Sequence, residues 1–126
     1  FKGEKAMDII KEFMSAPVLS VNTDASTEKA AKEMEEKKVS CLLVKANEES
    51  VGIITTSDLV KRVMAKGLDP KTTKVDFIMS KPLITINHYL TRSDANEMML
   101  RKKIKHIAVT EGSNVLGILT SKDMVT

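Results

Sequence analysis

The residues best suited to chemistry in this chain lie in a seven-residue pattern that occurs twice. The two copies are GIITTSD at residues 52–58 and GILTSKD at residues 117–123. Each reads as the end of a strand that turns into the first turn of a helix. Such a turn can bring free backbone N–H groups, a hydroxyl and a carboxylate into one small volume. The pattern therefore suits the binding of a sugar-phosphate group.

The same spacing also has a purely structural interpretation. Threonine followed three residues later by an acidic residue is a capping box, in which both side chains bond to the helix start. Thr55 with Asp58 and Thr120 with Asp123 both fit that description. We expect the two roles to coexist only if the carboxylate is free to leave the backbone.

Apolar spacing and helix caps predict the elements that position the first copy. Ser26 is a helix N-cap, Pro17 ends the first helix, and Gly67 closes the last one. The helix after Ser26 should turn Ala30, Ala31 and Met34 inward. We predict helices over 4–14, 27–38 and 57–66, strands over 18–21, 39–44 and 51–54, and a connector from residue 68 to residue 74.

The same order then restarts at a constant offset of 65 residues. MSAP at residues 14–17 matches MSKP at residues 79–82, and Asp58 matches Asp123. In the second copy, TRSD at residues 91–94 predicts a capping box that opens a helix. This register indicates a tandem duplication of a β-α-β-β-α unit, hence a mixed α/β (α+β) fold packed about a pseudo-twofold axis with two related clefts.

The predicted organisation has four parts, and the final one is incomplete. They are a lead-in (1–13), a first repeat (14–67), a connector (68–78) and a second repeat (79–126). The second repeat stops four residues into its last helix, so we expect that the chain continues in the native protein or that this helix was cut away. The missing initiator Met also favours an excised fragment.

Composition excludes several other classes of protein. The chain has 126 residues, of which 42% are hydrophobic and 29% charged, as in globular soluble proteins. No apolar run reaches the roughly 20 residues of a membrane helix, and one cysteine, Cys41, is compatible with a reducing, cytoplasmic compartment. We find no nucleophile–base pair, zinc-ligand spacing or phosphate-binding glycine loop, so we predict neither an enzyme nor a metal site.

These features resemble a tandem pair of cystathionine-beta-synthase (CBS) domains, the Bateman module. The resemblance rests on the Met-Ser-x-Pro segments, the VSCL and IKHI strands, and Gly-h-x-Thr-x-x-Asp, where h is aliphatic, each in both repeats. It implies a regulatory, energy-sensing role and an adenosyl ligand: AMP first, then ADP or ATP, and less favoured S-adenosylmethionine or NAD. It also implies clefts built from both repeats, with an aspartate accepting hydrogen bonds from the ribose diol.

Carried over residue by residue, the resemblance predicts two unequal clefts. The residues of the main cleft are Leu19, Val39, Ser40, Cys41, Lys105, His106, Thr120, Lys122 and Asp123. Those of the second cleft are Ile84, Ile104, Thr55, Ser57, Asp58 and Arg62, with His106 also on its base wall. The positions that match Lys105 and His106 are Ser40 and Cys41, which carry no charge. We therefore expect the Asp123 cleft to be the better one for an anionic ligand.

Other functions remain open on the sequence alone. The chain can be a ligand-free structural or dimerisation module, since some members of this family bind no ligand. Paired modules commonly meet through their helices, so we expect a homodimer and a fused or separate effector protein. The net charge of +3 is mild and aromatic residues make up 3%, which disfavours nucleic acid as a partner.

Overall fold

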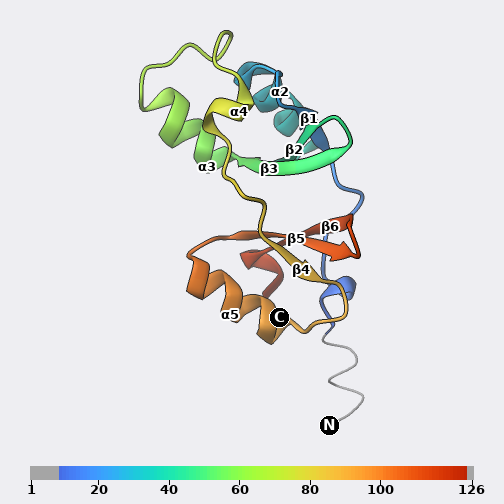
Figure 1. The fold of residues 1–126 in the computed structure, drawn as a ribbon. Helices are drawn as coiled ribbons and strands as arrows, with labels where there is room; N and C mark the ends of the chain where they lie inside the picture. The colour runs from blue at the N-terminus through green and yellow to red at the C-terminus, as the bar shows by residue number, and fades with distance from the viewer. Residues whose placement is uncertain (1–8, 125–126) are drawn as a thin grey trace. The chain divides into compact units, whose positions relative to one another are not determined.

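The structure, a computed structural model, describes residues 9–124 and divides into two compact units. Of the described residues, unit 1 combines those up to Val18 with those from Ile84 onward, and unit 2 comprises Leu19–Leu83. Each unit holds one three-stranded sheet, β1-β2-β3 in unit 2 and β4-β5-β6 in unit 1 (Figure 1).

The sheet of unit 2 is organised around its central strand, β2 (Cys41–Ala46). This strand runs parallel to β1 (Ser20–Asn22) and antiparallel to β3 (Glu49–Thr55). The first four residues of β2 are buried, as the nearly continuous apolar run in the sequence predicts. Asn47 makes the tight turn into β3 with φ of 59°, which asparagine tolerates better than most residues.

Helix α2 (Thr27–Lys37) confirms the predicted helix and its N-cap. The Ser26 side chain accepts a hydrogen bond of 3.0 Å from the backbone N–H of Lys29. Ala30 and Met34 are buried, but Ala31 is exposed, so its predicted inward orientation is wrong. The reason is angular: one residue past Ala30 rotates the side chain by about 100°, out of the apolar stripe.

The second helix of unit 2 differs in type from the prediction. A single helix was expected over 57–66, whereas α3 (Thr56–Asp58) continues into η2 (Leu59–Met64), a π-helical segment. The N–H of Ala65 donates to the carbonyl of Val60 at 2.8 Å, a spacing of five residues. Apolar periodicity does not separate this ladder from an α-helix, because both present one face to the core.

The connector contains a helix that the sequence did not reveal. Helix α4 (Val75–Ile78) is one turn long, too short for a periodic pattern, but Val75 and Ile78 are both buried. The connector also folds back on helix α2, where the buried Thr27 hydroxyl donates to the carbonyl of Pro70 at 3.1 Å.

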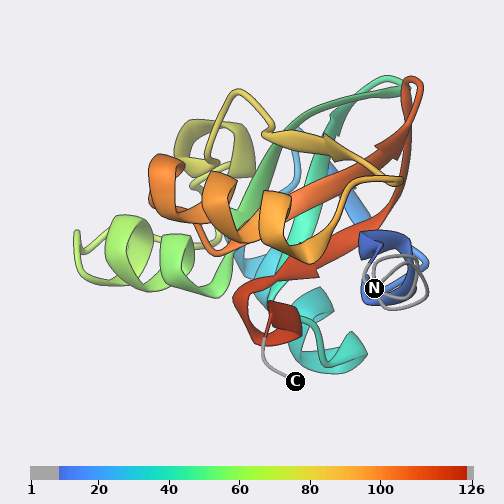
Figure 2. The same ribbon diagram turned by 90° about the horizontal axis from the view of Figure 1, so that it is seen from below.

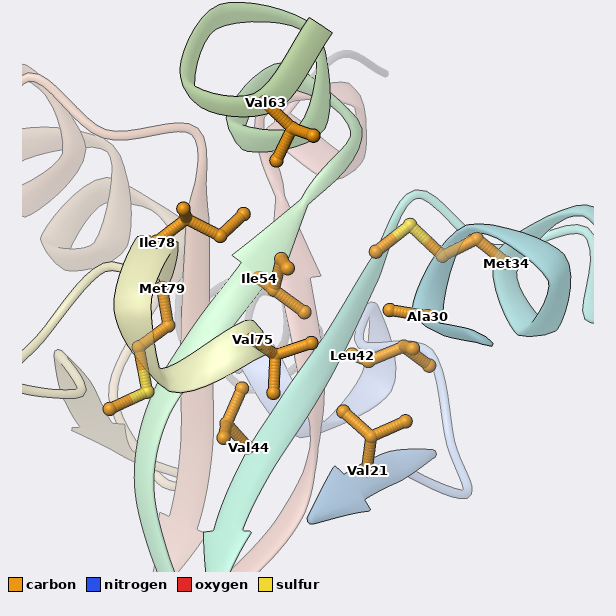
Figure 3. Close-up of a cluster of buried hydrophobic side chains, with 10 residues drawn as sticks. All are labelled: Val21, Ala30, Met34, Leu42, Val44, Ile54, Val63, Val75, Ile78 and Met79. Carbon is orange, nitrogen blue, oxygen red and sulfur yellow. The ribbon is translucent and has the colours of Figure 1, made fainter. Parts of the chain in front are cut away.

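A core between the helices and one sheet face holds unit 2 together (Figure 3). Helices α2, α3 and α4 lie on the same face of the sheet (Figure 1). The clustered side chains point toward one another and come from all three strands, from α2, η2 and α4, and from Met79 directly after α4: Val21, Ala30, Met34, Leu42, Val44, Ile54, Val63, Val75, Ile78 and Met79.

Unit 1 repeats this arrangement with a complete capping box. Its elements are β4 (Thr85–Asn87), α5 (Arg92–Lys102), β5 (His106–Glu111), β6 (Asn114–Thr120) and the short 3-10 helix η3 (Ser121–Met124). Helix α5 packs on the β4-β5-β6 sheet (Figure 2). As predicted, Thr91 and Asp94 cap its start reciprocally.

The duplication is visible in backbone detail. Strand pairing in the two sheets is identical at an offset of 65 residues, including a register shift after Val44 in one and after Val109 in the other. Lys38 and Lys103 both end their helices in the left-handed conformation. The predicted mixed fold class is confirmed, and both repeats have the predicted strand and helix order up to their last strand, after which the first continues into α3 and η2 and the second into the 3-10 helix η3.

The lead-in differs from the predicted helix over 4–14. Residues 4–8 of that prediction lie outside the described residues, and the remainder contains only η1 (Ile10–Glu12), a 3-10 turn. The N–H of Ile10 donates to the carbonyl of Leu90 at 2.9 Å, so it bonds to the loop before α5 and not to a preceding helical turn. The strand predicted over 18–21 likewise starts at Ser20.

Each repeat donates its first segment to the other unit. Ser15 forms two backbone hydrogen bonds with Ile118 on β6 of unit 1, at 2.8 and 2.9 Å. Ser80 forms the matching pair with Ile53 on β3 of unit 2, at 3.0 and 2.9 Å. The short segments around Ser15 and around Ser80 are called straps below. Each strap stands at the start of one predicted repeat, 14–67 or 79–126, but belongs to the compact unit that contains the sheet of the other repeat.

Candidate functional site

In unit 2 the motif forms a complete capping box. The carboxylate oxygen Oδ2 of Asp58 accepts hydrogen bonds from the backbone N–H of Thr55 at 3.0 Å and from its hydroxyl at 3.1 Å. The N–H of Asp58 donates in return to the Thr55 hydroxyl at 3.1 Å. Asp58 is only 8% exposed. The structural interpretation of the pattern is thus correct for this copy.

The second oxygen of Asp58 also has partners. The Ser80 hydroxyl donates to Oδ1 at 3.4 Å, and the Nε of Arg62 lies 3.6 Å from the same atom. The guanidinium of Arg62 also donates to the carbonyls of Ile78 and Met79, at 3.0 and 3.4 Å. Arg62, predicted on the phosphate side of a cleft, therefore ties α3 and η2 to the strap that contains Ser80.

In unit 1 the carboxylate of Asp123 is engaged on one side. Its Oδ2 accepts hydrogen bonds from the N–H of Thr120 at 2.8 Å and from the Thr120 hydroxyl at 3.3 Å. Within residues 9–124 its Oδ1 accepts none, and the residue is only half-buried. A carboxylate has about four acceptor positions. Asp123 can therefore cap its turn and still accept further hydrogen bonds without leaving the backbone.

The backbone N–H groups at the start of these helices are less available than the sequence predicts. Thr56 donates to the carbonyl of Ser40, and Ser121 donates to that of Lys105, both at 3.0 Å. The N–H of Asp58 is taken by the capping box. Two N–H groups of α3 and one of η3 are thus bonded within the protein, so side chains are a main part of what each turn offers to an anion.

Those side chains are basic in unit 1. His106 pairs with Thr120 across strands β5 and β6, and Lys105 precedes it with its carbonyl bonded to the turn. Lys105 and Lys122 are exposed, and His106 is half-buried. The structure thus brings Lys105, His106 and Thr120 of the predicted main cleft together around the turn that ends at Asp123.

The equivalent positions in unit 2 are neutral. Cys41 pairs with Thr55 across β2 and β3, Ser40 precedes Cys41, and Ser57 takes the place of Lys122. Cys41 is buried, and this burial raises the pKa of its thiol to about 11. It is one of the buried apolar residues of unit 2.

The predicted apolar residues lie within the separate units. Leu19 and Val39 are half-buried and pack against the core of unit 2, and Ile104 does the same in unit 1. Ile84 is half-buried, and its carbonyl accepts a hydrogen bond from Ala108 at 3.1 Å. The prediction that these residues wall an adenine base stays a prediction.

Sequence reasoning missed why the motif begins with glycine. A Cβ on Gly52 would lie 2.8 Å from the Sδ of Met79 and from the carbonyl oxygen of Ser80, and one on Gly117 would lie 2.6 Å from that of Ser15. Each glycine therefore admits a strap across the strand. The signal was present, because the Met-Ser-x-Pro segments and the glycines repeat at one offset.

Within residues 9–124, no three His, Cys, Asp or Glu side chains are grouped so that they could hold a metal ion. The helices of the same residues are too short or too polar to cross a membrane. His88 pairs with Glu111 at 3.6 Å on the far end of strand β5 from the motif.

Comparison with known proteins identifies the same family in both repeats. The family model described as CBS domain matches residues 10–65 and 75–126. The uncharacterised protein MJ0450 of Methanocaldococcus jannaschii is 32% identical over 115 residues, or 89% of this chain. This chain spans 61% of that protein and 53% of the uncharacterised protein MK0525 of Methanopyrus kandleri, which is 31% identical.

Solved structures agree with this assignment. A hexameric CBS-CP12 protein from bloom-forming cyanobacteria superposes with a TM-score of 0.86 at 33% identity, over 91% of this chain and 68% of that one. An uncharacterised conserved protein from Pyrococcus horikoshii gives a TM-score of 0.86 at 32% identity, over 95% and 91% of the two chains.

Proposed function

Because the chain belongs to the CBS domain family, we propose that it is a regulatory module that binds an adenine nucleotide, with AMP the preferred ligand. The observation that carries this proposal is the Asp123 turn. Its carboxylate is held in place by Thr120 through one oxygen, while the other oxygen accepts no hydrogen bond within the described residues. The basic residue Lys122 directly precedes Asp123, and Lys105 and His106 lie where the neighbouring strand β5 begins.

The ribose supplies the chemistry that fits this carboxylate. A cis-diol presents two hydroxyl donors side by side, and one carboxylate can accept both. Hydrogen bonds to an ionised acceptor are roughly twice as strong as those between neutral groups. Since Thr120 fixes the Asp123 side chain in advance, the ligand does not have to order it, which favours binding.

The phosphate is the reason to prefer unit 1 over unit 2. Lys105 and His106 stand beside the Asp123 turn and Lys122 lies within it, whereas Ser40, Cys41 and Ser57 hold the matching positions at the Asp58 turn. The cation at the Asp58 turn, Arg62, is paired with Asp58 itself. Two lysines and one histidine balance the charge of one or two phosphates better than that of three. We therefore propose AMP or ADP ahead of ATP, and the Asp58 turn as the weaker site or one suited to a less charged adenosyl group.

We propose no chemical reaction for this chain. The strongest nucleophile candidate, Cys41, is buried, and its pKa of about 11 keeps it a protonated thiol at neutral pH. Regulation would instead follow from ligand preference for one conformation over another, transmitted to a fused or separate effector. We propose that this regulation takes place in the cytoplasm.

A second function, a scaffold without ligand, is favoured by one specific observation. Both aspartates bond to their own backbone, as plain capping residues do. The exposed apolar side chains of Val60 and Met64 on η2, Phe77 on α4 and Leu100 on α5 would suit a homodimer formed through helices. The cyanobacterial CBS-CP12 relative is described as hexameric.

A thermal-shift screen separates these two functions. AMP, ADP, ATP, NAD and S-adenosylmethionine are each added to the purified chain, with guanosine monophosphate as the matched control for the base. A ligand at 100 times its dissociation constant stabilises the fold by about 2.7 kcal/mol. We expect the largest shift with AMP; unchanged melting with all five ligands supports the scaffold instead.

A further inference from the structure

We propose that Ser80 and Arg62 compete with the ligand for the Asp58 carboxylate and thereby determine that Asp123 is the preferred binding group. This inference rests on the proposed nucleotide binding and deepens it. Both specificity-determining residues lie outside the seven-residue motif at residues 52–58, and both contact its aspartate. They connect the Asp58 turn to the strap that contains Ser80.

The contacts at Asp58 leave little room for a ribose diol. Thr55 occupies Oδ2 through its N–H and its hydroxyl, while Ser80 and Arg62 occupy the side of Oδ1 at 3.4 and 3.6 Å. The residue is 8% exposed. A diol that bonds to Oδ1 must therefore displace the serine hydroxyl and the guanidinium, and their hydrogen-bonding groups must find new partners.

That displacement has a structural consequence. Arg62 holds the carbonyls of Ile78 and Met79, and Ser80 is held by its side chain to Asp58 and by its backbone to Ile53. The side chains of Asp58 and Arg62 together thus make three hydrogen bonds to residues 78–80. Occupation of Asp58 would remove the Ser80 side-chain contact, so that Ser80 itself is held by the two backbone hydrogen bonds with Ile53.

The other unit provides an internal comparison. Ser15 is the repeat counterpart of Ser80 and makes the same two backbone hydrogen bonds, with Ile118. Its side chain is exposed and makes no hydrogen bond to Asp123 in the described part of the chain. The two straps make the same backbone hydrogen bonds. They differ because the Ser80 hydroxyl donates to the Asp58 carboxylate, whereas the Ser15 hydroxyl does not donate to Asp123 within the described residues.

The test measures AMP binding by calorimetry in an Asp123→Asn background, where only the Asp58 turn retains its charge. Loss of one competing hydrogen bond should tighten binding roughly five-fold in Ser80→Ala. Arg62→Gln should act in the same direction, and the matched control Ser15→Ala should leave the affinity unchanged. Unchanged or weaker binding in Ser80→Ala overturns the proposal, because the hydroxyl would then be neutral or a ligand contact.

A second measurement needs no nucleotide and separates this proposal from the proposed function. Hydrogen exchange of the peptide that contains residues 76–83 should accelerate in Ser80→Ala and in Asp58→Asn, and not in Ser15→Ala. Accelerated exchange without AMP binding in any variant confirms the contact between Asp58 and the strap, overturns the competition with a ligand and contradicts the proposed nucleotide binding. Exchange that is the same in all variants overturns the contact between Asp58 and the strap.

Discussion

Asp58 and Asp123 stand at the same position of one duplicated motif, yet their carboxylates meet different partners. Asp58 is bonded at both oxygens, and Asp123 at one within residues 9–124. The sequence predicted unequal turns from the charges of Lys105 and His106 against Ser40 and Cys41. The structure adds a separate reason, because Ser80 and Arg62 occupy the Asp58 side chain.

Cys41 gives a residue-scale prediction about pH. Its pKa is raised from 9.0 to about 11 by burial, so the unfolded chain loses the thiol proton before the folded chain does. The contribution to stability is present below pH 9 and is lost as pH rises from about 9 to about 11. Urea unfolding should therefore show a steeper loss of stability over this window in the wild type than in Cys41→Ala.

Comparison with Cys41→Ala controls for the lysines, which titrate in the same pH range in both proteins. A difference that is constant from pH 7 to pH 11 reports only the packing of the side chain and contradicts the raised pKa.

What could be predicted at the residue scale depended on whether the partners were local. Ser26 and the Thr91–Asp94 pair were found because a cap and its target lie three residues apart. The contact between Ser80 and Asp58 spans 22 residues and a change of direction, so no spacing rule reveals it. The contacts of Arg62 with the carbonyls of Ile78 and Met79, 16 and 17 residues away, escaped prediction for the same reason.

At the scale of elements, the strap and the strand it crosses form the main unpredicted feature. The Met-Ser segments were recognised as repeats, but their destination depends on tertiary folding. Gly52 and Gly117 are the positions where a strap lies closest to a strand. The strands, α2 and α5 were predictable because their apolar spacing is long enough to read, whereas α4 and η1 have one turn or less.

We predict that alanine at either motif glycine destabilises the fold. The added Cβ would lie under 3.0 Å from the backbone oxygen of Ser80 or Ser15, which side-chain rotation cannot relieve. Overpacking of this kind costs about 1–3 kcal/mol of unfolding free energy. Chemical denaturation of Gly52→Ala and Gly117→Ala measures it.

Ser113→Ala in the exposed turn between β5 and β6 is the matched control, and it should change stability by less than about 0.5 kcal/mol. Wild-type stability in both glycine variants would show that the straps do not press on these strands.

For the whole molecule, the exchange of straps makes each repeat depend on residues that precede the other one. Ile10 lies before the first repeat but is fully buried in the core of unit 1. Its counterpart at the offset of 65, Val75, lies before the second repeat and is buried in the core of unit 2.

Ile10→Ala and Val75→Ala should therefore loosen opposite parts of the chain. A cavity at Ile10 should cost about 2–5 kcal/mol, with the smaller Val75 truncation costing less. Hydrogen exchange should accelerate in β5 and β6 for Ile10→Ala and in β2 and β3 for Val75→Ala. The reverse pattern, with each substitution loosening the repeat that follows it, would contradict the exchange.

The most direct test of the account is calorimetric titration of AMP into the wild type, Asp123→Asn and Asp58→Asn. Asparagine keeps an oxygen for the capping hydrogen bonds and removes the charge offered to the ribose, so Asp123→Asn should unfold at a temperature similar to that of the wild type. Asp58→Asn should unfold at a lower temperature, because Ser80 and Arg62 lose their carboxylate partner. We predict measurable binding in the wild type, a loss of at least ten-fold in affinity for Asp123→Asn, about 1.4 kcal/mol, and a much smaller loss for Asp58→Asn. Equal losses would contradict the inequality of the two turns, and no binding in the wild type would contradict nucleotide sensing itself.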